Sequence, residues 1–484
     1  MTPDQPGWSP DLDADALLRR AAEISAETLR QAALDNVTTP LPSELLDALR
    51  SAPLPREGTP AQDVVADIAR NIAPHPMGNG HPRFLAWVNS PPHPLGAAAA
   101  AIANAMNPSV AGGRHAAVHV EQEVVRWFLE LLDWAPPQSH GLLTSGGSAA
   151  TLTALGAARH RAYARAGLDD RRDGLAGPRP TVYATSEAHS CVVKAVEALG
   201  IGSANIRRVA ADGDRMRPAD LARMLADDRA AGRLPVAVVA SVGTVNTGAI
   251  DPIGAIADVC AEHDVWLHVD GAYGGPAALF LDEFADVRAE LTRVDSLGLD
   301  PHKWLYVPVD AGLVLFRDAA AARETYSLVP PYLFTEPSPE EPVWFSEYGL
   351  EQTRPFRALK LWAQLRHLGV DGYREFIGRD IAVAEALRDA LDDADDFELL
   401  ASGLSVVCFR HLAPGLNDAG QDAHNRALAT SLQAGGEVFL ASTTVGERTA
   451  LRACVVNPLT TTRDIPEILA SIRRAAEISM RGWG

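Results

Sequence analysis

Cysteine is scarce in this chain of 484 residues, and its placement excludes two architectures. The four cysteines, Cys191, Cys260, Cys408 and Cys454, are widely spaced and form no CxxC pair. Small secreted domains and structural zinc sites both depend on cysteines at characteristic short spacings. We therefore expect reduced thiols in a cytoplasmic protein, with no metal site built on them.

The chain also has little that would target it to a membrane or to nucleic acid. Its first 20 residues carry acids and prolines instead of the basic and then apolar pattern of a signal peptide. The most apolar run, Leu95 to Ile102, is far shorter than the roughly 20 residues that a membrane helix needs. The net charge of −19 disfavours contact with a phosphate backbone. We expect neither a membrane nor a nucleic-acid partner.

The distribution of apolar residues predicts three regions: an N-terminal helical arm (1–80), a large domain (81–374) and a small C-terminal α/β domain (375–484). In the arm, residues 13–35 have helical spacing, and a proline-rich stretch follows. Short β-rich runs alternate with helical segments from about 110 to 320, which predicts a mostly parallel sheet between helices. The strands after residue 374 favour an antiparallel sheet. An arm of this length is a candidate contact for a second subunit.

The segment from Thr144 to Ser148, TSGGS, lies between a predicted strand and a predicted helix. Its glycines allow close approach of a ligand, and the amides at the start of a helix attract an anion. Gly147 and Ser148 are therefore candidate phosphate contacts. An ordinary turn with a serine cap is the alternative interpretation.

Two charged residues come after predicted strands in the same domain. Asp270 ends the strand VWLHVD, where a carboxylate needs a cation or hydrogen-bond donors nearby. A protonated pyridine nitrogen would meet that need, although a turn cap or an arginine partner would too. Lys303 lies in DPHKW, where apolar neighbours would lower its pKa and free its amine to form an imine. A solvated surface lysine is the alternative.

The motifs HVDGAYGG and LDPHKWLYVP resemble the group II amino-acid decarboxylases that depend on pyridoxal phosphate. The resemblance extends from HPRFLAW near residue 81 through SGGSAATLTAL, SEAHS, GTVNTGAIDP and RPFRALKLW to LRACVVNP. It implies fold-type I, the aspartate-aminotransferase-like α/β fold, and release of CO₂ and an amine from an L-amino acid. It also implies a homodimer whose active site lies near the subunit interface.

The resemblance further assigns roles to particular residues. It implies that Lys303 holds pyridoxal phosphate as a Schiff base, that Asp270 pairs with the pyridine nitrogen, and that His189 stacks on the ring. The other cofactor contacts that it implies or suggests are Gly147, Ser148, Thr244, Ala272, Asp300 and His302. The chain departs from the family pattern at two of these places. Val245 comes after Thr244 where a second threonine is usual, so Thr244 or Asn246 would make the contact of the missing hydroxyl, and Asp300 replaces an asparagine.

A third departure concerns the tyrosine that reprotonates the substrate carbon in this family. Counting back without gaps from RPFRALKLW places Phe345 at that position, and phenylalanine has no proton to give. With phenylalanine at this position the chain resembles the plant aldehyde synthases. The resemblance suggests an alternative product, an aldehyde formed by decarboxylation and oxidative deamination. Tyr348 or Tyr332 would supply the proton if the loop is threaded differently.

The substrate side of the predicted site lies in HPRFLAWVNSPPHPLG. The resemblance places Trp87, Ser90 and Pro91 near the substrate side chain, and residues 107–109 in the neighbouring subunit's site. Trp87 suits an aromatic or bulky apolar amino acid, although a core position is equally open. An aminotransferase and a non-catalytic protein that kept the fold are the remaining alternatives.

Overall fold

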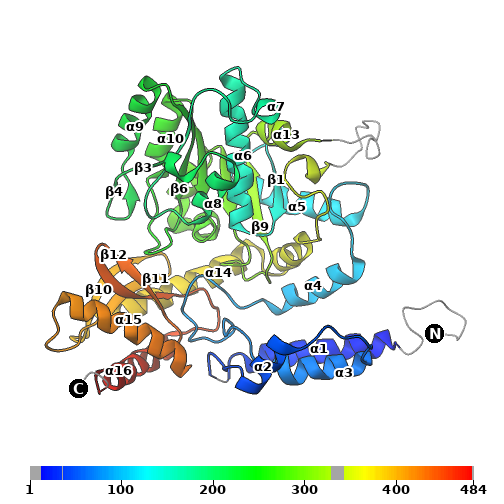
Figure 1. The fold of residues 1–484 in the computed structure, drawn as a ribbon, viewed down its shortest axis with the longest axis vertical. Coiled ribbons are helices and arrows are strands. Elements are labelled where there is room, and N and C mark those ends of the chain that lie inside the picture. Colours follow the sequence, from blue (N-terminus) through cyan, green and yellow to red (C-terminus); the bar gives the residue numbers. More distant parts are fainter. Residues whose placement is uncertain (1–11, 35, 329–342, 482–484) are drawn as a thin grey trace, which may run out of the picture.

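A computed structural model describes residues 12–34, 36–328 and 343–481 of the chain. It has an α/β fold with a large sheet, a smaller sheet and a group of N-terminal helices beside the smaller sheet (Figure 1). Within the described residues, no helix is long and apolar enough to cross a membrane.

The large sheet has seven strands in the order β1-β9-β8-β7-β6-β2-β3. Its strands are β1 (His140–Thr144), β2 (Pro180–Ala184), β3 (Ile206–Arg208), β6 (Leu234–Ser241), β7 (Trp266–Asp270), β8 (Ser296–Leu299) and β9 (Gly312–Phe316). Strands β3, β2, β6, β7 and β8 are parallel, whereas β9 is antiparallel to both β8 and β1. Because β1 and β8 are both antiparallel to β9, β1 runs in the same direction as the parallel strands and ends at the same edge of the sheet. The predicted, mostly parallel sheet is confirmed.

Helices cover both faces of this sheet because its strands are apolar on both sides. Almost all of β6 is buried, which is typical of a strand between two helical layers. Helix α6 (Gly147–Arg165) packs across β6 to β9, while α10 (Ile253–Glu262) contacts β6 and β7 and α11 (Gly275–Phe280) contacts β8. The surrounding elements are α5 (Ala116–Leu131), α7 (Asp170–Asp173), α8 (Cys191–Ala198), α9 (Pro218–Ala230), α12 (Ala285–Leu291), α13 (Ala320–Tyr326), β4 (Ala211–Asp212) and β5 (Arg215–Met216).

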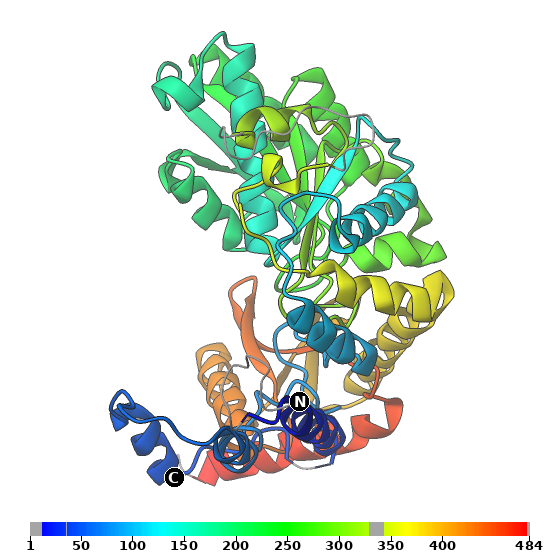
Figure 2. The ribbon, with the colours of Figure 1, turned by 90° about the vertical axis from the view of Figure 1, so that its right-hand side faces the viewer.

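The smaller sheet is antiparallel, as predicted, with the strand order β10-β11-β13-β12. Its strands are β10 (Phe397–Gly403), β11 (Val406–His411), β12 (Ala441–Val445) and β13 (Arg448–Cys454), and its helices are α15 (Asp418–Gly435) and α16 (Ile465–Arg481). A separate apolar cluster that includes Phe409 and Ile472 lies between them. This sheet lies below the large one in both views (Figures 1 and 2).

The N-terminal region consists of α1 (Ala14–Gln31), α2 (Ser43–Ser51) and α3 (Ala61–Asp67), and α4 (Pro94–Met106) comes next in the chain. Helix α1 begins where the Asp13 side chain accepts a hydrogen bond from the amide of Ala16 at 3.0 Å. Helices α1 to α3 bury none of their residues within one chain. Their apolar side chains therefore stay at least partly exposed in the monomer.

Helix α14 (Ala358–Asp392) joins the two sheets, since it contacts α4 and α5 as well as β10 and β11. Gly369, with φ 63° and ψ −174°, interrupts its helical geometry. The boundary predicted at residues 374 and 375 falls inside this helix, so the two parts of the chain share one element. The division into 1–80, 81–374 and 375–484 stays a prediction.

Candidate active site

A cavity of about 570 Å³ lies at the carboxyl edge of the large sheet, where β12 and β13 of the smaller sheet approach it. This is the position at which open α/β sheets bind their ligands. The lining includes nine residues that the sequence predicted: Trp87, Gly147, Ser148, His189, Asp270, Ala272, Asp300, His302 and Lys303. The strand ends thus place the Gly-rich turn, the carboxylate and the lysine around one space.

Lys303 comes after β8 in a tight turn and is largely buried. Its Nζ lies 2.9 Å from Oδ2 of Asp300. Burial favours the neutral amine, but the carboxylates of Asp300 and Asp270 outweigh it and raise the pKa of Lys303 above its ordinary value. The expected lowering of this pKa is therefore wrong for the free lysine, because sequence neighbours do not show which carboxylates fold against the amine.

Asp270 closes β7 and lines the same cavity. Its Oδ1 accepts a hydrogen bond from the amide of Ala272 at 3.1 Å, and its Oδ2 lies 3.9 Å from Sγ of Cys191. Neither contact neutralises a negative charge. The carboxylate is thus available to a protonated group inside the cavity.

His189 is the imidazole that lines this cavity beside Asp270. Its Nδ1 accepts a hydrogen bond from the amide of Cys191 at 3.1 Å, which leaves Nε2 as the nitrogen that carries the proton. Burial lowers the pKa of His189 below its ordinary value. The ring is accordingly neutral near pH 7 and offers a flat, uncharged face.

The Gly-rich turn connects β1 to the start of α6. A Cβ at Gly147 would lie 2.9 Å from Oδ2 of Asp300 and 3.3 Å from Cβ of Ala272, so a larger residue there would have to displace the buried carboxylate of Asp300. The first amides of α6, together with Ser148, face the cavity at the positive end of a helix of 19 residues. This arrangement can hold a phosphate.

Asp300 and His302 flank the lysine. The side chain of Asp300 is buried and its Oδ1 has no hydrogen-bond partner within the described residues, while His302 accepts a hydrogen bond from the amide of Ala311 at 3.2 Å. An unpaired carboxylate oxygen beside the turn calls for a donor or cation in the complete site. Lys303 is the cation that lies against the other oxygen of Asp300.

The structure does not bring every predicted residue to the cavity. Thr244 is buried, and its hydroxyl contacts Thr247 at 3.2 Å and accepts from the amide of Ala249 at 3.0 Å. It therefore stabilises its own loop, whereas Asn246 reaches the cavity instead. Ser90 and Pro91 are buried outside the cavity lining, and the Ser90 hydroxyl donates to the carbonyl of His302 at 3.3 Å.

Phe345 and Tyr348 also lie elsewhere. Phe345 is fully buried in a short 3-10 helix (Phe345–Glu347), where its ring stacks on His140 and lies under the guanidinium of Arg354. Tyr348 packs edge-on against the same His140. An apolar ring is more stable in this core than against a polar substrate. The expectation that Phe345 takes the place of the family tyrosine at the substrate, which came from counting back without gaps, is therefore wrong for this cavity. Tyr332 lies outside the described residues.

Arg452 is a cavity residue that the sequence analysis did not name, whereas Asn246 was one of the two candidates for the contact of the missing hydroxyl. Arg452 is buried on β13, where it donates to the carbonyls of Trp87 and Asn246, both at 3.1 Å, and its Nη2 has no partner in the described part of the chain. The Asn246 side chain donates to Glu187 at 2.9 Å and accepts from Thr443 at 2.6 Å. An arginine in the buried strand LRACVV was the available signal, since buried charges need partners.

These groups fit pyridoxal phosphate: a helix N-terminus for the phosphate, a carboxylate for a ring nitrogen, a flat imidazole and a lysine amine. The fold and cavity therefore define a pyridoxal-phosphate enzyme with the α/β fold of type I. The comparison with known families agrees, because the model of the pyridoxal-dependent decarboxylase conserved domain matches residues 42–412. The chain belongs to this family and is a pyridoxal-phosphate-dependent amino-acid decarboxylase, a carboxy-lyase.

Individual relatives share most of the chain. An aromatic-L-amino-acid decarboxylase from Bacillus atrophaeus is 32% identical over 447 residues, which cover 91% of this chain and 91% of that protein. An L-2,4-diaminobutyrate decarboxylase from Rhizobium meliloti (strain 1021) is 32% identical over 434 residues, covering 88% and 84%. The crystal structure of Oryza sativa TDC with PLP and tryptamine has a TM-score of 0.88 and 30% identity, covering 98% of this chain and 100% of that one.

Proposed function

We propose that this decarboxylase acts on an aromatic L-amino acid and releases CO₂ and the corresponding amine. The observation that carries the proposal is the presentation of Trp87. Its indole is 48% exposed, lines the cavity, and is backed by Phe439 at 5.5 Å and Phe84 at 5.9 Å between ring centroids. Paired aromatic rings contribute about 0.5–1.5 kcal/mol beyond the area they bury.

A diaminobutyrate substrate fits this cavity less well. Its second ammonium group would need a carboxylate, and among the described lining residues the carboxylates are Asp270 and Asp300. In our proposal Asp270 serves the cofactor and Asp300 lies against Lys303. The sequence identities do not separate the two substrate classes, since both relatives are 32% identical to the chain.

The residues of the cavity would each take a separate part in the reaction. Lys303 would form the covalent link to the cofactor, Asp270 would hold a proton at its ring nitrogen, and neutral His189 would pack on the ring. Gly147, Ser148 and the N-terminus of α6 would hold the phosphate. When bound, pyridoxal phosphate withdraws electrons from the bond to the departing carboxylate.

Arg452 would orient the substrate. Its Nη2 is a buried donor without a partner among the described residues, so a substrate carboxylate would complete its hydrogen bonds and gain about 1.5–3 kcal/mol from a charged contact. The guanidinium is already held in place by the carbonyls of Trp87 and Asn246. A fixed donor of this kind lowers the entropic cost of positioning the reacting group.

The aldehyde-forming alternative depended on Phe345 facing the substrate. Phe345 is instead buried in the core of its own subunit, so nothing in the described part of the chain favours that product. Of the two tyrosines that were alternative proton donors, Tyr348 packs on His140 outside the cavity lining, and Tyr332 lies outside the described residues and stays an alternative. Membership of the decarboxylase family also disfavours the aminotransferase and non-catalytic interpretations.

We further propose a cytoplasmic homodimer. Apolar side chains of the N-terminal region and of α4 are 44–67% exposed in one chain, among them Leu18, Val64, Ile68, Ile102 and Met106. A second copy would cover them and would bring residues 107–109 toward the neighbouring site. Light scattering after size-exclusion chromatography tests this proposal, and a monomer at micromolar concentration would contradict it.

The main test is a substrate panel of tryptophan, tyrosine, phenylalanine, glutamate and 2,4-diaminobutyrate, with CO₂, amine, aldehyde and 2-oxo acid all quantified. We expect an aromatic substrate to give CO₂ and amine in equal amounts. Preferred turnover of 2,4-diaminobutyrate, or aldehyde as the main product, would contradict the proposal. Borohydride reduction of the holoenzyme should mark Lys303 and neither Lys194 nor Lys360, the two other lysines of the chain; the Lys303→Ala variant should lose both the mark and turnover.

A further inference from the structure

Strand β1 lies at the edge of the large sheet, with β9 on one side and, among the described residues, no strand on the other. Leu143, in its interior, is completely buried, yet its amide and its carbonyl find no second strand on that open side. Glu121 Oε1 accepts a hydrogen bond from this amide at 2.9 Å, and Arg354 Nη2 donates to this carbonyl at 2.5 Å. Two side chains thus close the edge as a neighbouring strand would.

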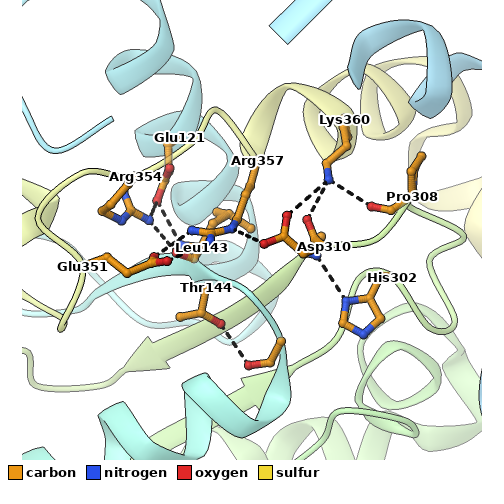
Figure 3. Close-up of polar contacts among 12 residues, drawn as sticks. Glu121, Leu143, Thr144, His302, Pro308, Asp310, Glu351, Arg354, Arg357 and Lys360 are labelled. Atoms are coloured by element: carbon orange, nitrogen blue, oxygen red, sulfur yellow. Dashed lines mark hydrogen bonds and ion pairs between the residues drawn. The ribbon is translucent and has the colours of Figure 1, made fainter. Parts of the chain in front are cut away.

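The two side chains also bind one another. Arg354 Nη2 and Glu121 Oε1 form an ion pair at 2.5 Å, and both side chains are fully buried (Figure 3). Arg354 is held further by Val110, whose carbonyl accepts from Nη1 at 2.8 Å and whose amide donates to the Arg354 carbonyl at 2.7 Å. The pair therefore occupies one defined position between α5, β1 and the segment that precedes α14.

This position matters because Leu143 leads directly into the Gly-rich turn. Thr144 is the next residue, and its hydroxyl donates to the carbonyl of Gly146 at 3.2 Å (Figure 3). Gly147 then begins α6, whose first amides face the cavity. Because the clamped residue and the proposed phosphate contact belong to one short stretch of backbone, a shift of Leu143 would be transmitted to that turn.

The segment that carries Arg354 also holds the opposite side of the turn. Arg357 donates to Asp310 at 2.9 Å, and Lys360 Nζ donates to the carbonyls of Asp310 at 2.6 Å and Pro308 at 3.0 Å (Figure 3). Gly312 lies just beyond Asp310 in the chain, and a Cβ there would lie 2.5 Å from the Cα of Gly146. The cations of RPFRALK thereby fix both backbone segments that enclose the Gly-rich turn.

We propose that Glu121 and Arg354 are positioning residues for the cofactor: by clamping the amide and carbonyl of Leu143, they hold the Gly146–Gly147 turn where the N-terminus of α6 receives the phosphate. The inference rests on the proposed cofactor site. Neither residue lines the cavity, so both act through the backbone of β1. A substitution of either residue should therefore weaken cofactor binding more than a substitution elsewhere that lowers stability by the same amount.

The test compares Arg354→Lys with Arg159→Lys. Arg159, on α6, also bridges a buried carboxylate and a backbone carbonyl, Asp170 at 2.9 Å and Leu199 at 3.0 Å. It lies about 18 Å along the helix from Gly147, at a rise of about 1.5 Å per residue. Lysine keeps the charge in both variants but cannot reproduce the forked contacts.

The measurement is the dissociation constant of pyridoxal phosphate from titration of each apoenzyme, monitored by visible absorption, with folding checked by circular dichroism. We expect Arg354→Lys to raise this constant about tenfold or more, the equivalent of one lost hydrogen bond to a charged group. Arg159→Lys should stay within about twofold of wild type, since its contacts lie far from the turn. Wild-type binding by folded Arg354→Lys, or an equal loss in Arg159→Lys, would overturn the inference.

If Arg354→Lys does not fold, Glu121→Gln provides the decisive measurement. Its amide oxygen can still accept from Leu143, while the charge that holds Arg354 is lost. We expect weaker cofactor binding by at least about threefold, since the ion pair becomes a hydrogen bond from the charged guanidinium to a neutral oxygen. Unchanged binding would overturn the inference. Failure of the wild-type apoenzyme itself to bind pyridoxal phosphate at Lys303 would instead contradict the proposed function.

Discussion

Asp380 provides a quantitative prediction about stability and pH. It lies on α14, fully buried, and its Oδ2 accepts hydrogen bonds from Nε1 of Trp304 at 2.9 Å and from the hydroxyl of Tyr306 at 2.8 Å. Across the described ranges no cation forms a direct ion pair with it, and its Oδ1 has no partner. Burial, partly offset by these two bonds, raises the pKa of Asp380 from 3.8 to about 7.

The sign of the effect is set by linkage between protonation and folding. Because the folded protein binds this proton more tightly than the unfolded chain, the contribution to stability is complete below about pH 4 and is lost as the pH rises through about 7. A difference of about three between the two pKa values corresponds to about 4 kcal/mol. With an unfolding entropy of about 2.1 cal/mol/K per residue, this amounts to a Tm change of about 4 °C for a chain of this length.

The informative substitution is Asp380→Asn, which mimics the protonated acid and cannot titrate. The Tm of wild type and variant is measured by circular dichroism between about pH 5 and pH 8.5. Over this range about 2.7 kcal/mol of the total is lost, so we expect the Tm of wild type to fall by about 3 °C relative to the variant. Asp371→Asn, at an exposed position of the same helix, is the control and should follow wild type at every pH. Parallel Tm curves for wild type and Asp380→Asn would refute the reasoning.

Three further predictions concern the cavity and its surroundings. Asp270→Asn should lower kcat about tenfold to hundredfold, because it removes one charged hydrogen bond of about 1.5–3 kcal/mol to the cofactor. A steady-state CO₂ assay measures this, and an unchanged kcat would show that Asp270 does not hold the ring nitrogen. Trp87→Leu should raise KM for aromatic substrates about threefold to tenfold, as expected from one aromatic pair, and initial rates against substrate concentration test it. Phe345→Leu should lower Tm through a loss of about 1–3 kcal/mol of packing while the ratio of amine to aldehyde stays constant; a changed ratio would restore a catalytic role.

Much of the cavity could be predicted from the sequence because its residues come directly after strands. Asp270 ends β7, Lys303 comes after β8 and Gly147 comes after β1, and the carboxyl ends of these strands meet at one edge of the sheet. Periodicity and turn residues reveal such strands locally. The cofactor and the carboxy-lyase reaction were predicted from motifs that lie within this edge, and the family comparison confirmed both.

Other features depended on contacts that no local pattern records. The hydroxyl of Thr244 turns toward its own loop, and Phe345 is buried against His140, more than about 200 residues earlier in the chain. Arg452 reaches the cavity from the smaller sheet. Each outcome is decided by which distant side chain is close enough to satisfy a donor or to cover an apolar ring.

Short-range periodicity was thus enough to predict the succession of strands and helices and the polar residues at the strand ends, and the resemblance of the local motifs to the decarboxylases indicated the type of cofactor. The folded arrangement was needed to show that Asp300 raises the pKa of Lys303 and that Glu121 and Arg354 close the edge of β1. The interaction between two charges in solvent weakens steeply with their separation, and so does a buried hydrogen bond. They therefore depend on the three-dimensional positions of residues that lie far apart in the chain.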